Sequence, residues 1–274
     1  MTPPYLEKRG LLAAALVFVL ACAISWGIWC GIAPDTNDRS LDALLGNPAL
    51  LAMKFGPSLA GLAVALMLGG AAGIADLGAR IFDLHKRIVS SLGALAYAAL
   101  VTLPAGALFI ALFLPDAEIP GLGVAMLTPL AGWIALRTLL GGGLGEEIGW
   151  RGVALPALLS RLGPRWASLW LGLAWTVWHA PVFFASETPW WILALVQTAL
   201  TVPLSFVFTW FFLRSGGSLF VAVLLHGALN GFNAFTEFTW APALDEAGAW
   251  ALLRIGVILA TGVAACVFMA PKNR

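Results

Sequence analysis

The sequence predicts an all-α fold, a bundle of about eight transmembrane helices with both termini in the cytoplasm. Composition is the first observation behind this fold class, because 61% of the 274 residues are hydrophobic and only 11% are charged. The second is a mean hydropathy of +0.92, and the third is a series of apolar windows of about 20 residues, the length of a spanning helix. We therefore expect an integral, multi-pass membrane protein, located in the plasma membrane if the organism is bacterial.

The expected spans follow one another along the whole chain. They cover residues 11–32, 50–74, 89–114, 122–143, 166–185, 190–213, 217–239 and 249–270. The first window follows Lys8 and Arg9, and its length favours a retained span over a cleaved signal peptide. Proline residues in or beside the windows are expected to kink helices, namely Pro57, Pro129, Pro181 and Pro203. Since neither a linker nor a repeat interrupts the windows, residues 1–274 are expected to form a single integral membrane domain.

Charged residues in the connections alternate between basic and acidic sides. The basic side contains Lys8, Arg9, Arg80, Lys86, Arg87, Arg161, Arg165, Arg214, Lys272 and Arg274. Cytoplasmic connections are enriched in lysine and arginine, so both termini and the connections 75–88 and 151–165 are expected in the cytoplasm. The connection 75–88 also has apolar residues at helical spacing, which is typical of a short amphipathic helix at the membrane interface. An odd number of spans would break the alternation.

Net charge and cysteine usage exclude several classes of function. A net charge of +1 provides no clustered basic face, so nucleic acid is not an expected partner. The three cysteines form no CxxC pair, which argues against a disulfide framework or a zinc finger. The partner that composition predicts is the lipid bilayer.

The segment 141–151 concentrates charge within this apolar chain, because it contains Glu146, Glu147 and Arg151. Ionisable groups at membrane depth are costly and usually mark a functional site. On a helix, Glu147 and Arg151 have the i, i+4 spacing at which opposite charges meet. Glu146 points about 100° away from Glu147, so we expect it to be the freer acid and a candidate general base.

Two histidines and an asparagine lie in later windows. At about 1.5 Å per residue, His179 and His226 both fall inside the membrane, where they can meet. Asn230 follows His226 by four residues, so both project from one helix face. Glu146 joins them only if it lies deeper than the predicted end of the window 122–143. Each residue alone has a structural explanation as an interhelical hydrogen bond, but together they favour a shared polar site.

The order of these polar residues resembles the CAAX-protease and bacteriocin-processing family of intramembrane proteases, also called Abi, which is related to the Ras-converting CAAX endopeptidase. Its three motifs, EExxxR, FxxxH and HxxxN, correspond here to Glu146, Glu147 and Arg151, then His179, then His226 and Asn230. The motif-bearing core is residues 141–230. Trp175 departs from the pattern, because it stands where the second motif usually has phenylalanine.

This resemblance implies an intramembrane endopeptidase that hydrolyses a peptide bond of a membrane-associated protein or peptide. Glu146 and His179 would activate a water, whereas His226 and Asn230 would stabilise the oxyanion. The second glutamate and the arginine of the first motif would hold the motif helix in position. The outer spans carry no specific signal.

The need for a cofactor stays open from the sequence. Glu146, His179 and His226 form an acceptable ligand set for a divalent metal such as zinc, but a direct glutamate and histidine mechanism needs no metal. Two other classes of function also remain as alternatives. One is a proton-coupled transporter that uses Glu146 and His179 as a relay, and the other is a catalytically silent membrane scaffold or immunity protein.

Overall fold

The computed structural model of the chain describes residues 3–7, 9–32, 48–82, 88–113, 126–244 and 248–269. Within these residues the regular secondary structure is helical and contains no β-strand. The predicted all-α fold class is therefore confirmed. Apolar side chains from both halves of the chain meet in one large buried cluster, which extends from Leu6 to Ala265.

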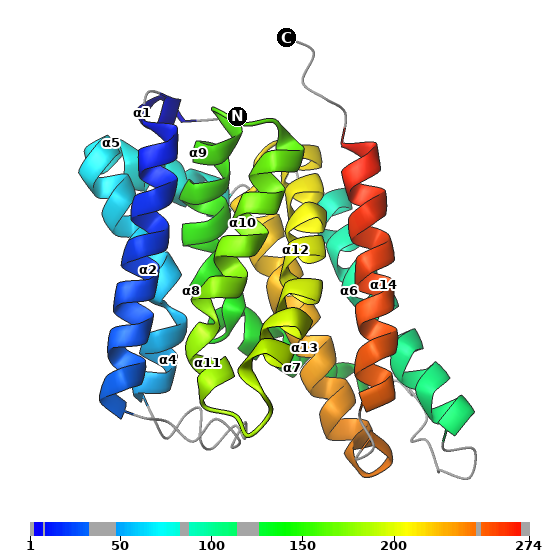
Figure 1. Cartoon of the computed structure of the whole chain (residues 1–274). Coiled ribbons are helices and arrows are strands. Elements are labelled where there is room, and N and C mark those ends of the chain that lie inside the picture. Colours follow the sequence, from blue (N-terminus) through cyan, green and yellow to red (C-terminus); the bar gives the residue numbers. More distant parts are fainter. Residues whose placement is uncertain are drawn as a thin grey trace.

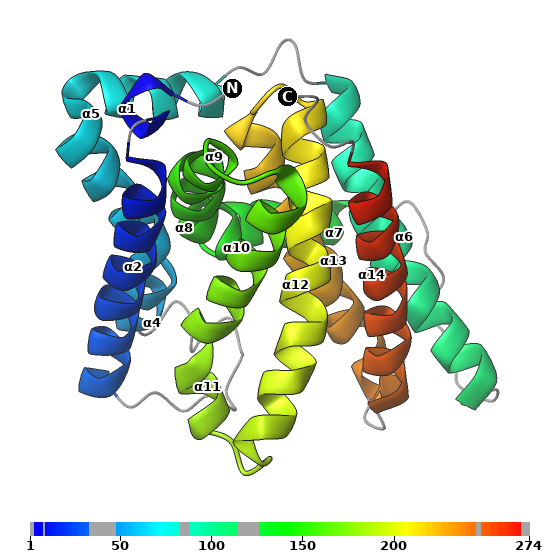
Figure 2. The same ribbon diagram turned by 45° about the horizontal axis from the view of Figure 1, so that its top comes forward.

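The first half of the chain forms α1 (Pro4–Glu7), α2 (Gly10–Ile32), α4 (Pro48–Lys54), α5 (Gly56–Phe82) and α6 (Ile88–Phe113). The predicted window 50–74 is interrupted between α4 and α5, where Pro57 occupies the first turn of the new helix. Gly70 has a φ of 58°, a left-handed conformation that favours glycine. The kink turns the second half of α5 across the end of the bundle (Figure 2).

The second half forms α7 (Leu127–Leu139), α8 (Gly142–Gly149), η2 (Trp150–Ala154), α9 (Leu155–Leu159), α10 (Pro164–Trp178), α11 (Ala180–Phe184), α12 (Trp190–Arg214), α13 (Leu219–Leu244) and α14 (Gly248–Phe268). Figure 1 shows that α2 begins and α14 ends at the same end of the bundle. This arrangement is the one that an even number of crossings requires. The cytoplasmic assignment of that end stays a prediction.

Four described helices are long and apolar enough to cross a membrane, namely Gly10–Gly31, Gly56–Phe82, Trp190–Arg214 and Leu219–Thr236. Shorter apolar segments occupy Ile88–Leu103 and Leu252–Phe268. The count of eight spans stays a prediction. Some of the charges used to derive it, Lys8, Lys86, Arg87, Lys272 and Arg274, lie outside the described residues.

The structure corrects the window 122–143 and the connection after it. α7 ends at Leu139, and a new helix made of α8, η2 and α9 runs from 142 to 159. The expected connection 151–165 is therefore wrong over most of its length. The glycines and charged residues of the helix 142–159 lower its hydropathy below that of a typical spanning helix. The helix is nevertheless buried, because other helices rather than lipid surround it.

The helix 142–159 lies in the middle of the bundle, with α2 and α5 on one side and α10, α12 and α13 on the other (Figure 2). Glycines permit this central position. A Cβ atom placed on Gly61 of α5 would lie 2.6 Å from the Cα atom of Gly149, so the two backbones touch directly. Small residues commonly allow such close helix contacts in membranes.

Candidate active site

The first motif lies on the central helix, where α8 continues into η2. η2 is a π-helical turn in which the N–H of Leu155 donates to the carbonyl of Trp150. Such turns occur frequently at functional sites. Arg151 lies within this turn and donates from Nη1 to Glu147 Oε1 over 2.8 Å, so the predicted ion pair forms. Both side chains are fully buried.

Glu147 is the centre of a buried charged network. Its Oε1 atom also accepts a hydrogen bond from His226 Nδ1 over 2.7 Å. The guanidinium of Arg151 lies over the rings of Phe208, at 4.1 Å, and Trp175, at 4.7 Å. Glu147 therefore connects the central helix to α13 and orients His226, a contact that the sequence analysis did not predict.

Glu146 does not share the partners of Glu147, because it points about 100° away from Glu147 around the helix. Trp175 Nε1 donates to Glu146 Oε2 over 2.7 Å, and Glu146 Oε1 lies 3.9 Å from His226 Nε2. From the sequence, Trp175 is only an aromatic residue in the place of phenylalanine. Its indole N–H is the group that phenylalanine lacks, and it holds the carboxylate of Glu146 in one orientation.

His179 lies where α10 ends and α11 begins. Pro181 lies in the first turn of α11, where a proline cannot continue the preceding helix. His179 Nδ1 lies 2.8 Å from the carbonyl oxygen of Trp175, and a carbonyl can only accept, so Nδ1 carries the hydrogen. Nε2 of the neutral ring is then an acceptor.

Glu146 lies well inside the bundle, at a position along the central helix from which it can reach Trp175 and His226. At about 1.5 Å per residue, Glu146 lies about 20 Å from the end of α9 at Leu159. The sequence predicts it near the end of a span, because the window 122–143 has the hydropathy of one continuous helix. The break between α7 and α8 places Glu146 inside the bundle instead.

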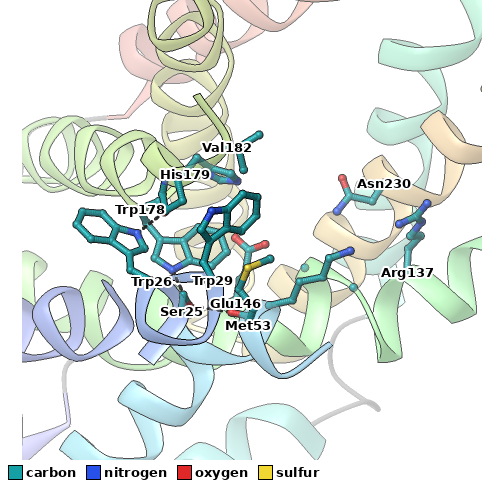
Figure 3. A pocket seen from close by; sticks show the side chains of 14 residues that line it. Ser25, Trp26, Trp29, Met53, Arg137, Glu146, Trp178, His179, Val182 and Asn230 are labelled. Carbon is teal, nitrogen blue, oxygen red and sulfur yellow. Dashed lines mark hydrogen bonds between the residues drawn. The ribbon is translucent and has the colours of Figure 1, made fainter. Parts of the chain in front are cut away.

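A cavity of about 180 Å³ contains three of the four catalytic candidates on its wall, Glu146, His179 and Asn230 (Figure 3). The fourth candidate, His226, is covered, with 5% of its surface exposed. It lies behind Glu146 and next to the ring of Trp175, at 5.4 Å between ring centroids.

Two basic residues that the sequence analysis did not select also line this cavity. Lys54 is the last residue of α4, and Arg137 lies in the last turn of α7. Arg137 was recognisable in principle, because it lies within the apolar window 122–143, where a charge is costly.

The three residues that could ligate a metal are not grouped as a metal site in the described structure. In the part of the chain that the structure describes, no group of three or more His, Cys, Asp or Glu side chains is arranged to hold a metal ion. Nδ1 of His226 is engaged with Glu147, and Nε2 lies 3.9 Å from Glu146. Among the described residues, Glu146, His179 and His226 are thus not grouped as a three-ligand site.

Gly142 allows Glu146 and His226 to approach each other. A Cβ atom on Gly142 would lie 2.5 Å from His226 Cε1 and 2.8 Å from Glu146 Oε1. We therefore expect Gly142→Ala to displace both side chains and to lower by about a hundredfold any turnover that depends on them, because small misplacements of catalytic groups cost about that much. Gly132→Ala is the matched control, since its Cβ would meet no atom within 4 Å. Equal turnover of the two variants would contradict this reading.

Comparison with known proteins agrees with the motifs. Residues 128–232, which contain all three motifs, match the family model described as type II CAAX prenyl endopeptidase Rce1-like. The CAAX prenyl protease 2 of Methanococcus maripaludis is 28% identical over 123 residues, which are 42% of this chain and 45% of that relative. The matched part is thus about half the length of the curated relative. The chain is an integral, multi-pass membrane protein, and its motif-bearing core is similar to the type II CAAX prenyl endopeptidases.

Proposed function

We propose that the protein is an intramembrane endopeptidase that hydrolyses a peptide bond of a membrane-associated protein or peptide. The observation that carries the proposal is the cavity onto which both Glu146 and His179 open. A carboxylate and an imidazole acceptor beside one space are the groups that general-base activation of water needs. The transporter and scaffold alternatives have no such supporting observation.

In the proposed reaction, Glu146 and His179 remove a proton from a water as its oxygen attacks the carbonyl carbon of the peptide bond. The π electrons of the carbonyl move to its oxygen, and an oxyanion forms. When this intermediate collapses, the carbon–nitrogen bond breaks and the proton passes to the leaving nitrogen. One water is consumed, and the products are a carboxylic acid and an amine.

His226 and Asn230 are the proposed oxyanion donors. They lie one turn apart on α13, and Asn230 reaches the cavity. Since Nδ1 of His226 donates to Glu147, Nε2 can donate only when the ring is an imidazolium. Two carboxylates, those of Glu146 and Glu147, flank the ring and provide the negative charge that such a cation requires. Donors aimed at a developing oxyanion are usually a large part of catalysis.

Trp175 is expected to act through Glu146. Trp175→Phe keeps an aromatic ring but removes the hydrogen bond to Oε2, and hydrogen bonds to charged groups contribute about 1.5–3 kcal/mol. We expect kcat to fall about tenfold to a hundredfold, with KM changed less than about twofold. Trp170→Phe, at an exposed site outside the cavity, is the control. An unchanged kcat in Trp175→Phe would show that this hydrogen bond does not position the base.

The proposed function is tested with detergent-purified protein and a library of membrane peptides, with mass spectrometry as the readout. Wild type is expected to release fragments that folded His179→Asn does not release. The absence of product from folded wild type on the whole library would overturn the proposal. A chelator arm is included, and loss of activity that zinc restores would add a metal to the mechanism.

A further inference from the structure

The cavity has two chemically different ends. Figure 3 shows Arg137 and Asn230 at one end, and the three tryptophans Trp26, Trp29 and Trp178 far from them at the other. Glu146 lies between the two ends (Figure 3). A peptide that occupies this space therefore meets polar groups on one side of the catalytic carboxylate and aromatic rings on the other.

Hydrogen bonds hold the aromatic end in place. Trp26 Nε1 donates to the carbonyl of Trp178 over 3.0 Å, and Trp178 Nε1 donates to Ser25 Oγ over 3.0 Å. Ser25 in turn donates to the carbonyl of Met53 over 2.8 Å. These contacts join α2, α4 and α10, so the rings of Trp26 and Trp178 form a fixed wall for an apolar side chain.

The other end of the cavity is basic. Arg137 lies at this end (Figure 3), Lys54 also lines the cavity, and Glu146 is the acidic residue among the described lining residues. Lysine and arginine are the usual partners of carboxylates, and arginine can hold both oxygens of one carboxylate. The attraction is stronger in the low dielectric of a membrane protein than in water. Among the groups that a peptide presents, carboxylates are the anions that match this end.

We propose that Lys54 and Arg137 bind a carboxylate of the substrate and thereby set the position of the cleaved bond relative to Glu146. This inference rests on the proposed peptidase function. The carboxylate is either the C-terminal group of the peptide or an Asp or Glu side chain, because both present the same chemistry. The apolar residue on the other side of the cleaved bond packs against the tryptophans.

The test compares peptides of one cleavable sequence in three forms: the free C-terminal acid, the C-terminal amide, and the acid with its Asp and Glu changed to Asn and Gln. Wild type is expected to show a KM about tenfold to a hundredfold higher for the form that lacks the recognised carboxylate, with kcat changed much less. The peptide form whose KM rises shows whether the recognised carboxylate is the C-terminal group or an Asp or Glu side chain. In Lys54→Met with Arg137→Met, the KM values of the three forms should become equal.

Two further variants make the result specific. Arg137→Lys keeps the charge and should keep part of the discrimination, whereas Arg161→Met, an exposed site outside the cavity, should keep all of it. Equal KM values for the three forms in wild type would overturn the carboxylate site while leaving the peptidase intact. If no form is cleaved, the peptidase proposal fails. The carboxylate-binding site is then tested separately, by measuring the equilibrium Kd of fluorescent peptides in the three forms. Equal Kd values for all three forms would then overturn it.

Discussion

Replacing Glu146 with glutamine is expected to abolish peptide cleavage while leaving the helix bundle folded. The amide oxygen of glutamine can still accept the hydrogen bond from Trp175 Nε1, so the geometry of the site is retained. An amide does not take a proton from water, and a positioned general base contributes about a hundredfold to ten-thousandfold. We therefore expect kcat to fall by at least about a hundredfold, with KM nearly unchanged.

Glu187→Gln is the matched control for this prediction, because Glu187 is exposed and lies outside the cavity. Both variants are measured on the same peptide, and thermal unfolding in detergent checks that both are folded. Turnover by folded Glu146→Gln at the rate of wild type would remove Glu146 from the chemistry and would leave His179 as the base.

The second large effect is expected from Glu147→Gln, and it is an effect on stability. The substitution leaves the guanidinium of Arg151 buried without its carboxylate partner, and breaking a buried ion pair typically costs about 3–5 kcal/mol. His226 Nδ1 also loses its charged acceptor. We expect the unfolding midpoint in detergent to fall by on the order of 10 °C.

A double-mutant cycle separates this effect from a general loss of packing. In Glu147→Gln with Arg151→Met, neither charge of the ion pair remains, so the loss of stability should be smaller than the sum of the two single losses. Additive losses would mean that the two side chains do not stabilise each other. Glu187→Gln again provides the baseline for a glutamate outside the network.

The long apolar helices were predictable because their side chains face lipid or other apolar side chains along their whole length. The windows 11–32 and 190–213 agree with α2 and α12 within one residue at each end. The Glu147 and Arg151 pair was also predictable, because i, i+4 spacing brings two side chains together within one helix. Neither inference depends on how the helices are arranged around each other.

The central helix was missed for a related reason. Hydropathy adds the contributions of one segment, and the segment 142–159 contains five glycines together with Glu146, Glu147 and Arg151. Such a segment can cross the bundle only when other helices cover it. Whether they do depends on contacts such as that between Gly61 and Gly149, which are far apart in the sequence.

The sequence by itself determined the helical class, the apolar spans and the polar residues from which a site can be built. Only the tertiary structure decided which of them touch. It placed the indole N–H of Trp175 on Glu146, His226 on Glu147, and Lys54 and Arg137 on the wall of the same cavity. These contacts depend on the rotation and depth of α4, α7, α8, α10 and α13 relative to one another. Packing across the bundle sets that rotation and depth, and no periodicity within a single helix records them.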